Sequence, residues 1–197
     1  MKVLFSTKKI LEKVDRKIWF ILTHSIYKSY FRSIGKSTLI YRPMQLDDMS
    51  SIVIENDVYI AQGAWLMGNS NANETLRIQS GTTIGHFSHI IAKDNVNIGK
   101  SVLIADRVFI SDCSHNYLNI DLPIKEQGIS IINPVVIGDN SWIGENVCII
   151  GASIGRNCII GANAVVNKDI PDYSIAVGNP ARVIKKYDWR KLDWVKI

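Results

Sequence analysis

Residues 54–66 read IENDVYIAQGAWL, with an aliphatic residue at every sixth position: Ile54, Ile60 and Leu66. A fixed six-residue period indicates a repeat architecture and is typical of a parallel β-helix. Each hexapeptide then forms one flat side of a coil, so one aliphatic side chain per side points inward and stacks on its equivalent in the next coil. The further members of the series, with Ala72 as a weak one, are Ile78, Ile84, Ile90, Ile98, Ile104, Ile110, Ile137, Ile143, Ile149, Ile154, Ile160 and Val166.

Other folds explain this pattern less well. An α-helix fails because residues six apart lie on different faces at about 3.6 residues per turn. An antiparallel sheet is disfavoured because polar pairs occupy the turns at fixed offsets, at Asp139-Asn140, Glu145-Asn146 and Arg156-Asn157. The alternative that remains is a β-sandwich with coincidental phasing. We therefore predict an all-β chain built as a parallel β-helix.

Composition narrows the function classes. A chain of 197 residues suits one domain, and its net charge of +5 with a pI near 9.1 favours acidic ligands. Nucleic acid is disfavoured because the basic residues gather at the two ends and no nucleic-acid-binding motif is present. The cysteines are Cys113, Cys148 and Cys158; their odd number and their spacing indicate a reduced, cytosolic context rather than disulfides or a metal site. We expect Cys148 and Cys158 to fill the core.

The sequence divides into three predicted parts. Residues 1–45 form a basic N-terminal extension with apolar residues at helical spacing, residues 46–187 form the β-helix, and residues 188–197 form a short C-terminal tail. The longest apolar run of the extension, residues 18–22, is too short to span a bilayer, and no cleavage site of a signal peptide follows it. Two interpretations of this helix stay open: contact with an anionic membrane surface, or packing on the β-helix or a neighbouring subunit.

Interruptions of the period show where a functional site is expected. The phase slips between Ile90 and Ile98, and the step from Ile149 to Ile154 is one residue short. The largest break, between Ile110 and Ile137, predicts a protruding loop over residues 111–134. Loops on rigid scaffolds commonly carry the chemistry, so His115 in this loop is the first candidate residue.

Several motifs together carry a family resemblance. They are the hexapeptides, the histidine shortly after ISD at residues 110–112, VIGDNSWIG at 136–144, KDIP at 168–171 and VGNPARVI at 177–184. Over roughly residues 50–187 the chain resembles the hexapeptide-repeat acetyltransferases, and most of all their galactoside and maltose O-acetyltransferase branch. The resemblance implies a left-handed β-helix, a homotrimer with active sites between subunits, acetyl-coenzyme A as co-substrate without a metal, and the matching histidine as general base.

The chemistry itself needs a base at this position. A sugar hydroxyl is too weakly acidic to attack a thioester unaided at neutral pH, and histidine, with an ordinary pKa of about 6.5, suits the proton transfer. We therefore assign His115 as the catalytic base. An acyl-enzyme on Cys113 is the less favoured alternative, because a thiol must be activated by contact with an oriented base. Supporting or acceptor-binding roles are expected for Asp112, Asn116, His86 and His89.

The resemblance also implies where coenzyme A binds. Gly144 and Ala162 are expected to line the extended pantetheine arm, with Asn167 and Lys168 further along it. Trp142 is expected to flank the cleft. Arg182 and Lys185 are expected to reach the nucleotide phosphates.

These features predict an acetyl-coenzyme A-dependent O-acetyltransferase that acts on a sugar hydroxyl of a bacterial surface-polysaccharide precursor. We expect a cytoplasmic enzyme, placed at the inner face of the cytoplasmic membrane if residues 1–45 bind lipid. Two alternatives stay open: an N-acetyltransferase for an amino-sugar nucleotide, and a β-helix binding module without catalysis. Fold alone does not decide among them.

Overall fold

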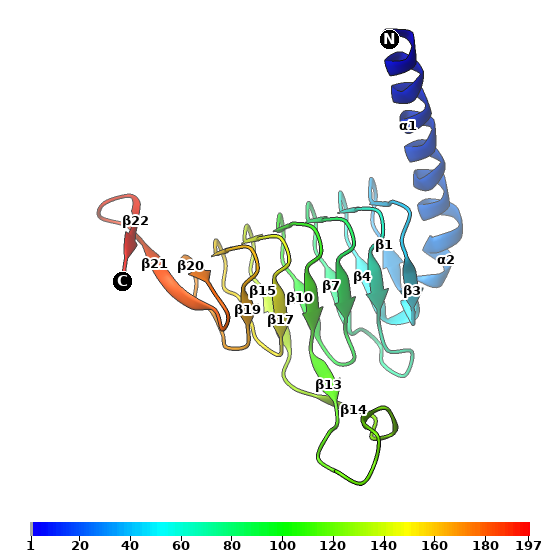
Figure 1. Ribbon diagram of the computed structural model, residues 1–197. Coiled ribbons are helices and arrows are strands. Elements are labelled where there is room, and N and C mark those ends of the chain that lie inside the picture. Colours follow the sequence, from blue (N-terminus) through cyan, green and yellow to red (C-terminus); the bar gives the residue numbers. More distant parts are fainter. Residues whose placement is uncertain (1) are drawn as a thin grey trace.

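The computed structural model describes residues 2–197, with side chains from Lys9 onward, and it forms a parallel β-helix of about seven coils (Figure 1). The coils up to β17 add one strand to each of three sheets, which form the three flat sides of the stack, and the last coils add only isolated bridges at Ile154 and Ile170 to the first side. The first sheet contains β1 (Ser33–Ile34), β4 (Ile52–Ile54), β7 (Leu76–Ile78), β10 (Val96–Ile98) and β15 (Val135–Ile137). The second contains β2 (Leu39–Ile40), β5 (Tyr59–Ile60), β8 (Thr83–Ile84), β11 (Leu103–Ile104), β16 (Trp142–Ile143), β18 (Ile159–Ile160) and β20 (Ser174–Val177). The third contains β3 (Gln45–Asp47), β6 (Trp65–Met67), β9 (His89–Ile91), β12 (Phe109–Ser111), β17 (Cys148–Ile150) and β19 (Val165–Val166).

The six-residue series forms the core, as predicted. On the second sheet Ile60 is in register with Ile84, and Ile84 with Ile104, so that equivalent side chains stack from coil to coil. Apart from Ala72, every predicted inward residue is no more than 1% exposed. The predicted turn positions also hold, since Asn140, Asn146 and Asn157 take a positive φ. The predicted fold class is therefore confirmed.

Three details of the sequence-based assignment are wrong. The first coil begins at Ser33 rather than at residue 46, because β1 pairs with β4 and β2 with β5. Ala72 is not a coil position: it lies half-exposed in the loop between β6 and β7. Cys158 is buried in the core, but Cys148 points outward from the third sheet and is partly exposed.

All irregular steps of the series fall at one corner of the coils. The steps from the first sheet to the second and from the second to the third keep the spacing of six, as at Ile98, Ile104 and Ile110. The step from the third sheet back to the first varies in length, and we call this edge the loop corner. Its connecting segments are residues 48–51, 68–75, 92–95, 112–134, 151–153 and 167–169. Interruptions that are scattered in the sequence are therefore neighbours along one edge of the molecule.

The two ends of the chain extend this body. Helix α1 (Lys2–Leu22) continues through a π-helical turn, η1 (Thr23–Tyr27), into the short α2 (Lys28–Tyr30), and α1 projects away from the first coil (Figure 1). The predicted helical extension thus ends well before residue 45. No helix within residues 2–197 has both the length and the hydropathy to cross a bilayer. The expected C-terminal tail is ordered instead, because β21 (Arg182–Asp188) and β22 (Asp193–Lys196) add antiparallel strands to the second sheet.

Candidate active site

A hairpin at the loop corner carries His115. The chain leaves the coils after β12, forms β13 (Cys113–His115), passes the short 3-10 helix η3 (Ile124–Glu126) and returns through β14 (Ile129–Ile131). Strands β13 and β14 pair antiparallel, with His115 opposite Ile129, and the hairpin projects from the stack (Figure 1). The predicted protruding loop is thus a hairpin whose backbone bonds fix the position of His115.

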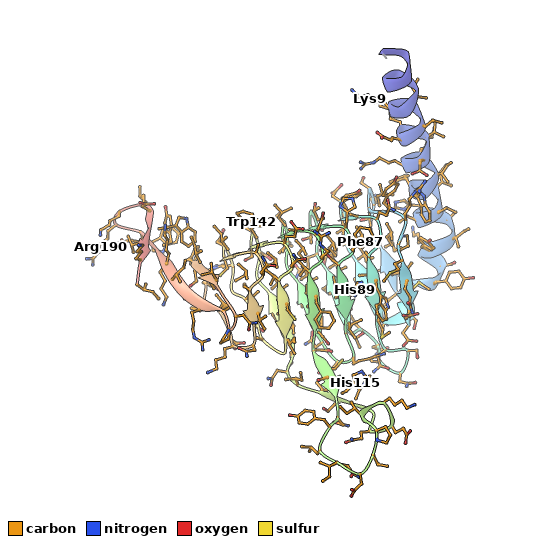
Figure 2. All side chains as sticks on the ribbon, viewed as in Figure 1. Lys9, Phe87, His89, His115, Trp142 and Arg190 are labelled. Atoms are coloured by element: carbon orange, nitrogen blue, oxygen red, sulfur yellow. The ribbon has the colours of Figure 1, made fainter. Side chains whose placement is uncertain are left out.

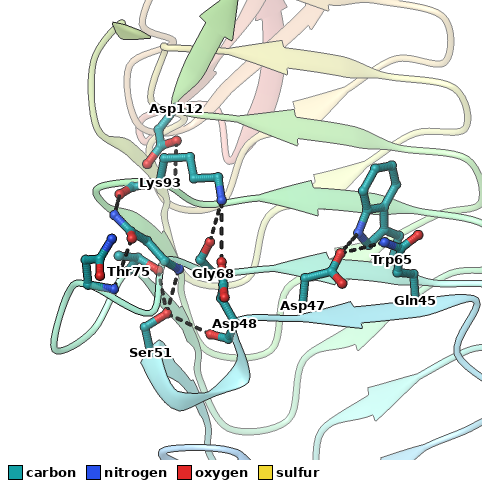
Figure 3. Close-up of polar contacts among 11 residues, drawn as sticks. Gln45, Asp47, Asp48, Ser51, Trp65, Gly68, Thr75, Lys93 and Asp112 are labelled. Carbon is teal, nitrogen blue, oxygen red and sulfur yellow. Dashed lines mark hydrogen bonds and ion pairs between the residues drawn. The ribbon is translucent and has the colours of Figure 1, made fainter. Parts of the chain in front are cut away.

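Asp112 anchors the root of this hairpin. Its side chain is fully buried, and its carboxylate accepts hydrogen bonds from the backbone N–H groups of Lys93, Asp94 and Asn95, at 2.9, 2.7 and 2.8 Å. Figure 3 shows the carboxylate above Lys93, whose Nζ donates to the carbonyl oxygen of Gly68 at 3.0 Å. Asp112 therefore ties its own segment of the loop corner to residues 92–95, and the Lys93 side chain links that segment to residues 68–75. Among the described side chains, no hydrogen bond joins the Asp112 carboxylate to His115, and its contacts here are with the backbone of residues 93–95.

Asn116 also has a different role from the one expected. Its side-chain nitrogen donates to the carbonyl oxygen of Gln127 at 3.0 Å, and its backbone nitrogen donates to that of Gly128 at the same distance. These bonds hold the two arms of the hairpin together beyond His115. Among the side chains that the structure describes, from Lys9 onward, none forms a hydrogen bond with the His115 ring. A group that orients this ring would have to come from elsewhere.

A cavity of about 450 Å³ lies between the hairpin and the outer surface of the third sheet. Cys113, Ser114, His115 and Ile129 form its hairpin wall, and Ser111 lies at its base. The sheet contributes Trp65, Met67, Ile91, Phe109 and Ile150. The lining beside His115 is mostly apolar, and the cavity leaves room there for a small substrate group.

The apolar outward residues of the third sheet that line the cavity escaped the sequence analysis. Met67 is in register with Ile91, and Trp65 with His89, so these side chains form continuous rows on the surface. Their positions could be read from the sequence, because each of these outward residues is directly adjacent to an inward residue of the hexapeptide series. Large apolar side chains at outward positions next to the longest loop would have pointed to this wall of the cavity.

The two candidate supporting histidines lie in different surroundings. The His89 ring packs edge-on against Trp65, with centroids 5.4 Å apart, and Trp65 lines the cavity. Trp65 is itself fixed by a hydrogen bond from Nε1 to Asp47 at 2.8 Å (Figure 3). His86 lies at the corner between the second and third sheets, where its Nδ1 is 3.1 Å from Asp106 Oδ1. His89 is therefore a neighbour of the cavity, and His86 is not.

Cys113 is a poor nucleophile in this environment. Its thiol lies 3.4 Å from the hydroxyl of Ser111 and is buried, and burial raises the pKa of the Cys113 thiol. A raised pKa leaves less thiolate at neutral pH, and the thiolate is the reactive form. The geometry favours a reaction without an acyl-cysteine.

The residues expected to bind coenzyme A divide between two edges of the molecule. Gly144 and Ala162 lie at the corner between the second and third sheets, whereas Asn167 and Lys168 lie at the loop corner. A Cβ at Gly144 would approach the backbone nitrogen of Ala162 to 2.7 Å. The close stacking of the coils is therefore enough to explain this glycine, whether or not it contacts coenzyme A.

The remaining coenzyme A candidates lie on the second sheet. Trp142 is 49% exposed on β16, and Figure 2 shows it on the opposite side of the stack from His115. Arg182 and Lys185 lie on β21. A single chain therefore does not bring the expected cofactor residues to His115.

Asp112→Asn is expected to lower the free energy of unfolding by about 2–4 kcal/mol, because an amide nitrogen would then face backbone N–H donors in a buried site. Turnover should fall as well, since the root of the His115 hairpin loses its anchor. Urea unfolding and steady-state kinetics measure the two effects. Asp121→Asn, which changes an exposed carboxylate of the same loop, should shift stability by less than about 0.5 kcal/mol. Unchanged stability of the Asp112 variant would contradict the anchoring role.

Known proteins resemble this chain in sequence. A family model described as the hexapeptide repeat of succinyl-transferase matches residues 134–168. A probable acetyltransferase of Mycobacterium tuberculosis is 44% identical over 67% of this chain and 45% of its own length. The putative lipopolysaccharide biosynthesis O-acetyl transferase WbbJ of Escherichia coli is 36% identical over 57% of this chain and 61% of its own length. The galactoside O-acetyltransferase of Escherichia coli is 32% identical over 75% of this chain and 73% of its own length.

Solved structures share the architecture. The N-acyltransferase AntD of Bacillus cereus, in complex with dTDP-4-amino-4,6-dideoxyglucose and coenzyme A, superposes with a TM-score of 0.70 at 21% identity, over 85% of this chain and 90% of AntD. A maltose O-acetyltransferase of Clostridium difficile gives a TM-score of 0.52 at 27% identity, over 95% of this chain and 90% of its own. At 21% identity, the likeness to AntD concerns the fold alone. The chain spans less than two thirds of the first two sequence relatives.

Proposed function

Because this chain belongs to the hexapeptide-repeat acetyltransferases, we propose that it transfers the acetyl group of acetyl-coenzyme A to a sugar hydroxyl. The observation that carries the proposal is the position of His115, on a hairpin fixed by backbone bonds and beside a cavity large enough for the reacting groups. The relative named for lipopolysaccharide biosynthesis favours a surface-polysaccharide precursor as the acceptor. An amine of an amino-sugar nucleotide is the alternative acceptor.

His115 acts as general base in the proposed reaction. The imidazole accepts the hydroxyl proton while the acceptor oxygen attacks the thioester carbonyl. The C–S bond breaks, the acetyl group stays on the sugar oxygen, and the imidazolium returns its proton to the coenzyme A thiolate. The buried thiol of Cys113 takes no part, and the transfer requires no metal.

We place the active site between subunits of a homotrimer. Two observations support this arrangement. The coenzyme A candidates are divided between the two edges of the third sheet and the second sheet, and the hairpin exposes apolar side chains. Tyr117, Leu118 and Ile120 are 69%, 86% and 94% exposed, which is typical of a surface that a partner covers. In a trimer, the His115 hairpin of one subunit can face the Gly144 and Ala162 edge of the next. Arg182 and Lys185 would then neutralise the phosphates of coenzyme A.

We propose a cytoplasmic location for the enzyme. The odd number of cysteines and the absence of metal-ligand spacing among them in the sequence support a reducing compartment. Contact with the inner face of the cytoplasmic membrane is expected if helix α1 binds lipid.

The proposal is tested by coenzyme A binding and then by product analysis. Coenzyme A at about one hundred times its Kd should stabilise the native protein by about 2.7 kcal/mol, which a thermal-shift experiment detects. Arg182→Ala with Lys185→Ala should weaken this effect, whereas Lys100→Ala, on an exposed turn, should not.

Incubation with labelled acetyl-coenzyme A and a panel of glycans then identifies the bond that forms. A product whose acetyl group mild alkali removes is an ester and supports O-acetylation. A product that resists mild alkali is an amide and would support the N-acetyltransferase alternative instead. If coenzyme A causes no thermal shift and no acetyl transfer is detected, the proposed function is wrong and a β-helix binding module without catalysis is favoured.

A further inference from the structure

Helix α1 contacts the β-helix through its polar face. Thr23, just after α1, is fully buried; its hydroxyl donates to the carbonyl oxygen of Trp19 at 2.8 Å and accepts from the backbone nitrogen of Ile40 at 3.2 Å. Asp15 accepts a hydrogen bond from the Tyr41 hydroxyl at 2.5 Å and two from the Arg42 guanidinium, at 2.9 and 3.1 Å. These contacts fix which side of the helix faces the coils.

The apolar face of the same helix points away from the body. Ile10, Val14, Ile18 and Ile21 lie within one side of the helix at about 100° per residue, and Leu11 borders them. All five are between 50% and 68% exposed. A helix that stabilises its own domain buries this kind of stripe, so the orientation seen here is the reverse of the usual one. A large exposed apolar patch marks a surface that binds something else.

Charge next to the stripe indicates the occupant. Lys9, Lys13 and Lys17 follow one another at intervals of four residues along one edge of the stripe. The acidic residue nearest the other edge, Asp15, is already paired with Arg42. Two copies of the helix packed antiparallel, stripe against stripe, would bring their lysine rows together. Parallel packing would set each row beside the edge whose nearest acid, Asp15, is already paired with Arg42. An anionic lipid surface matches both the apolar stripe and the lysine row.

We propose that α1 lies in the interface of an anionic membrane, with the Ile10–Ile21 stripe in the lipid and the lysine row at the headgroups. Such helices combine a strongly apolar face with basic residues and bind through buried apolar area together with attraction to anionic lipids. This inference concerns attachment and not catalysis, so its test needs no acetyl acceptor.

Vesicle sedimentation with the full chain tests the proposal. Vesicles of phosphatidylglycerol and phosphatidylcholine in equal amounts should bind the protein, and raised salt should weaken binding because it screens the attraction. Vesicles of phosphatidylcholine alone should bind at least about tenfold less. Val14→Glu with Ile18→Glu should reduce binding about tenfold or more, since it places charge in the stripe. Lys9→Glu with Lys13→Glu and Lys17→Glu should reduce binding similarly and remove most of its salt dependence.

Matched variants on the coils provide the controls. Leu103→Glu changes a residue of the second sheet that is 50% exposed, and Lys100→Glu changes an exposed turn; neither should alter vesicle binding. The thermal shift with coenzyme A should persist in the α1 variants, which separates failure of this inference from failure of the proposed function. Equal binding of wild type and the Val14/Ile18 variant would overturn the proposal. If that variant instead changes the oligomeric mass in light scattering while vesicle binding stays the same, the stripe is a subunit interface.

Discussion

His115→Ala is expected to reduce turnover by about two to four orders of magnitude, the usual contribution of a positioned general base. The imidazole is the side chain on the hairpin wall of the cavity that is suited to general-base catalysis. Its removal leaves the acceptor hydroxyl without a partner for its proton. The hairpin should keep its shape, because its pairing with β14 uses backbone groups. The measurement is initial-rate kinetics with labelled acetyl-coenzyme A.

The control for this variant is binding. The thermal shift with coenzyme A should remain close to that of wild type, since His115 is not expected to hold the nucleotide or its phosphates. Cys113→Ala should retain most of the activity, because the thiol is buried and its pKa is raised. A His115→Ala enzyme that keeps its activity would refute the assignment of the base. An inactive Cys113→Ala enzyme that still folds would favour the acyl-cysteine alternative.

The repeat made the fold readable from sequence. Inward positions such as Ile84 and Ile104 obey a local rule, one side chain per flat side, so the period alone predicts the core. The prediction failed where the pattern becomes weak. Ile34, Ile40 and Leu46 continue the series backward into the first coil, but basic and polar neighbours made this stretch look like part of the extension.

Within the candidate site, the sequence pointed to a residue only where its type alone suggests a catalytic role. His115 stands out because few side chains can serve as a base and because it lies in the longest loop. The role of Asp112 depends on backbone N–H groups of residues 93–95, in the preceding coil, and no sequence pattern reveals that contact. The sequence also did not reveal that all irregular segments lie at the loop corner. The six-residue period predicts the spacing of inward residues, but it does not show to which sheet the chain returns after an interruption.

Mixed trimers are expected to recover activity from two inactive chains. His115→Ala removes the base, and Ala162→Arg places a bulky charged side chain at the corner between the second and third sheets, in the expected path of pantetheine. Ala162 is exposed, so this change should leave the coils intact. Trimers of either variant alone should have very low activity, because every site then lacks the base or has a blocked cleft. If each site combines the hairpin of one subunit with the opposite edge of the next, some sites in a mixed trimer carry neither change.

The expected recovery can be counted. In trimers assembled at random from equal amounts of the two chains, half of the hairpins retain His115 and half of the facing edges retain Ala162, so about a quarter of all sites are intact. These sites belong only to mixed trimers, in which one of the three sites, about a third, is intact. Coexpression with two different affinity tags and purification over both isolates mixed assemblies for assay. A site contained in one chain would give no recovery, because every chain then carries a damaging change. Recovery in the mixture, beside inactive parents of normal thermal stability, would therefore support a site shared between subunits, and its absence in proven mixed trimers would refute that arrangement.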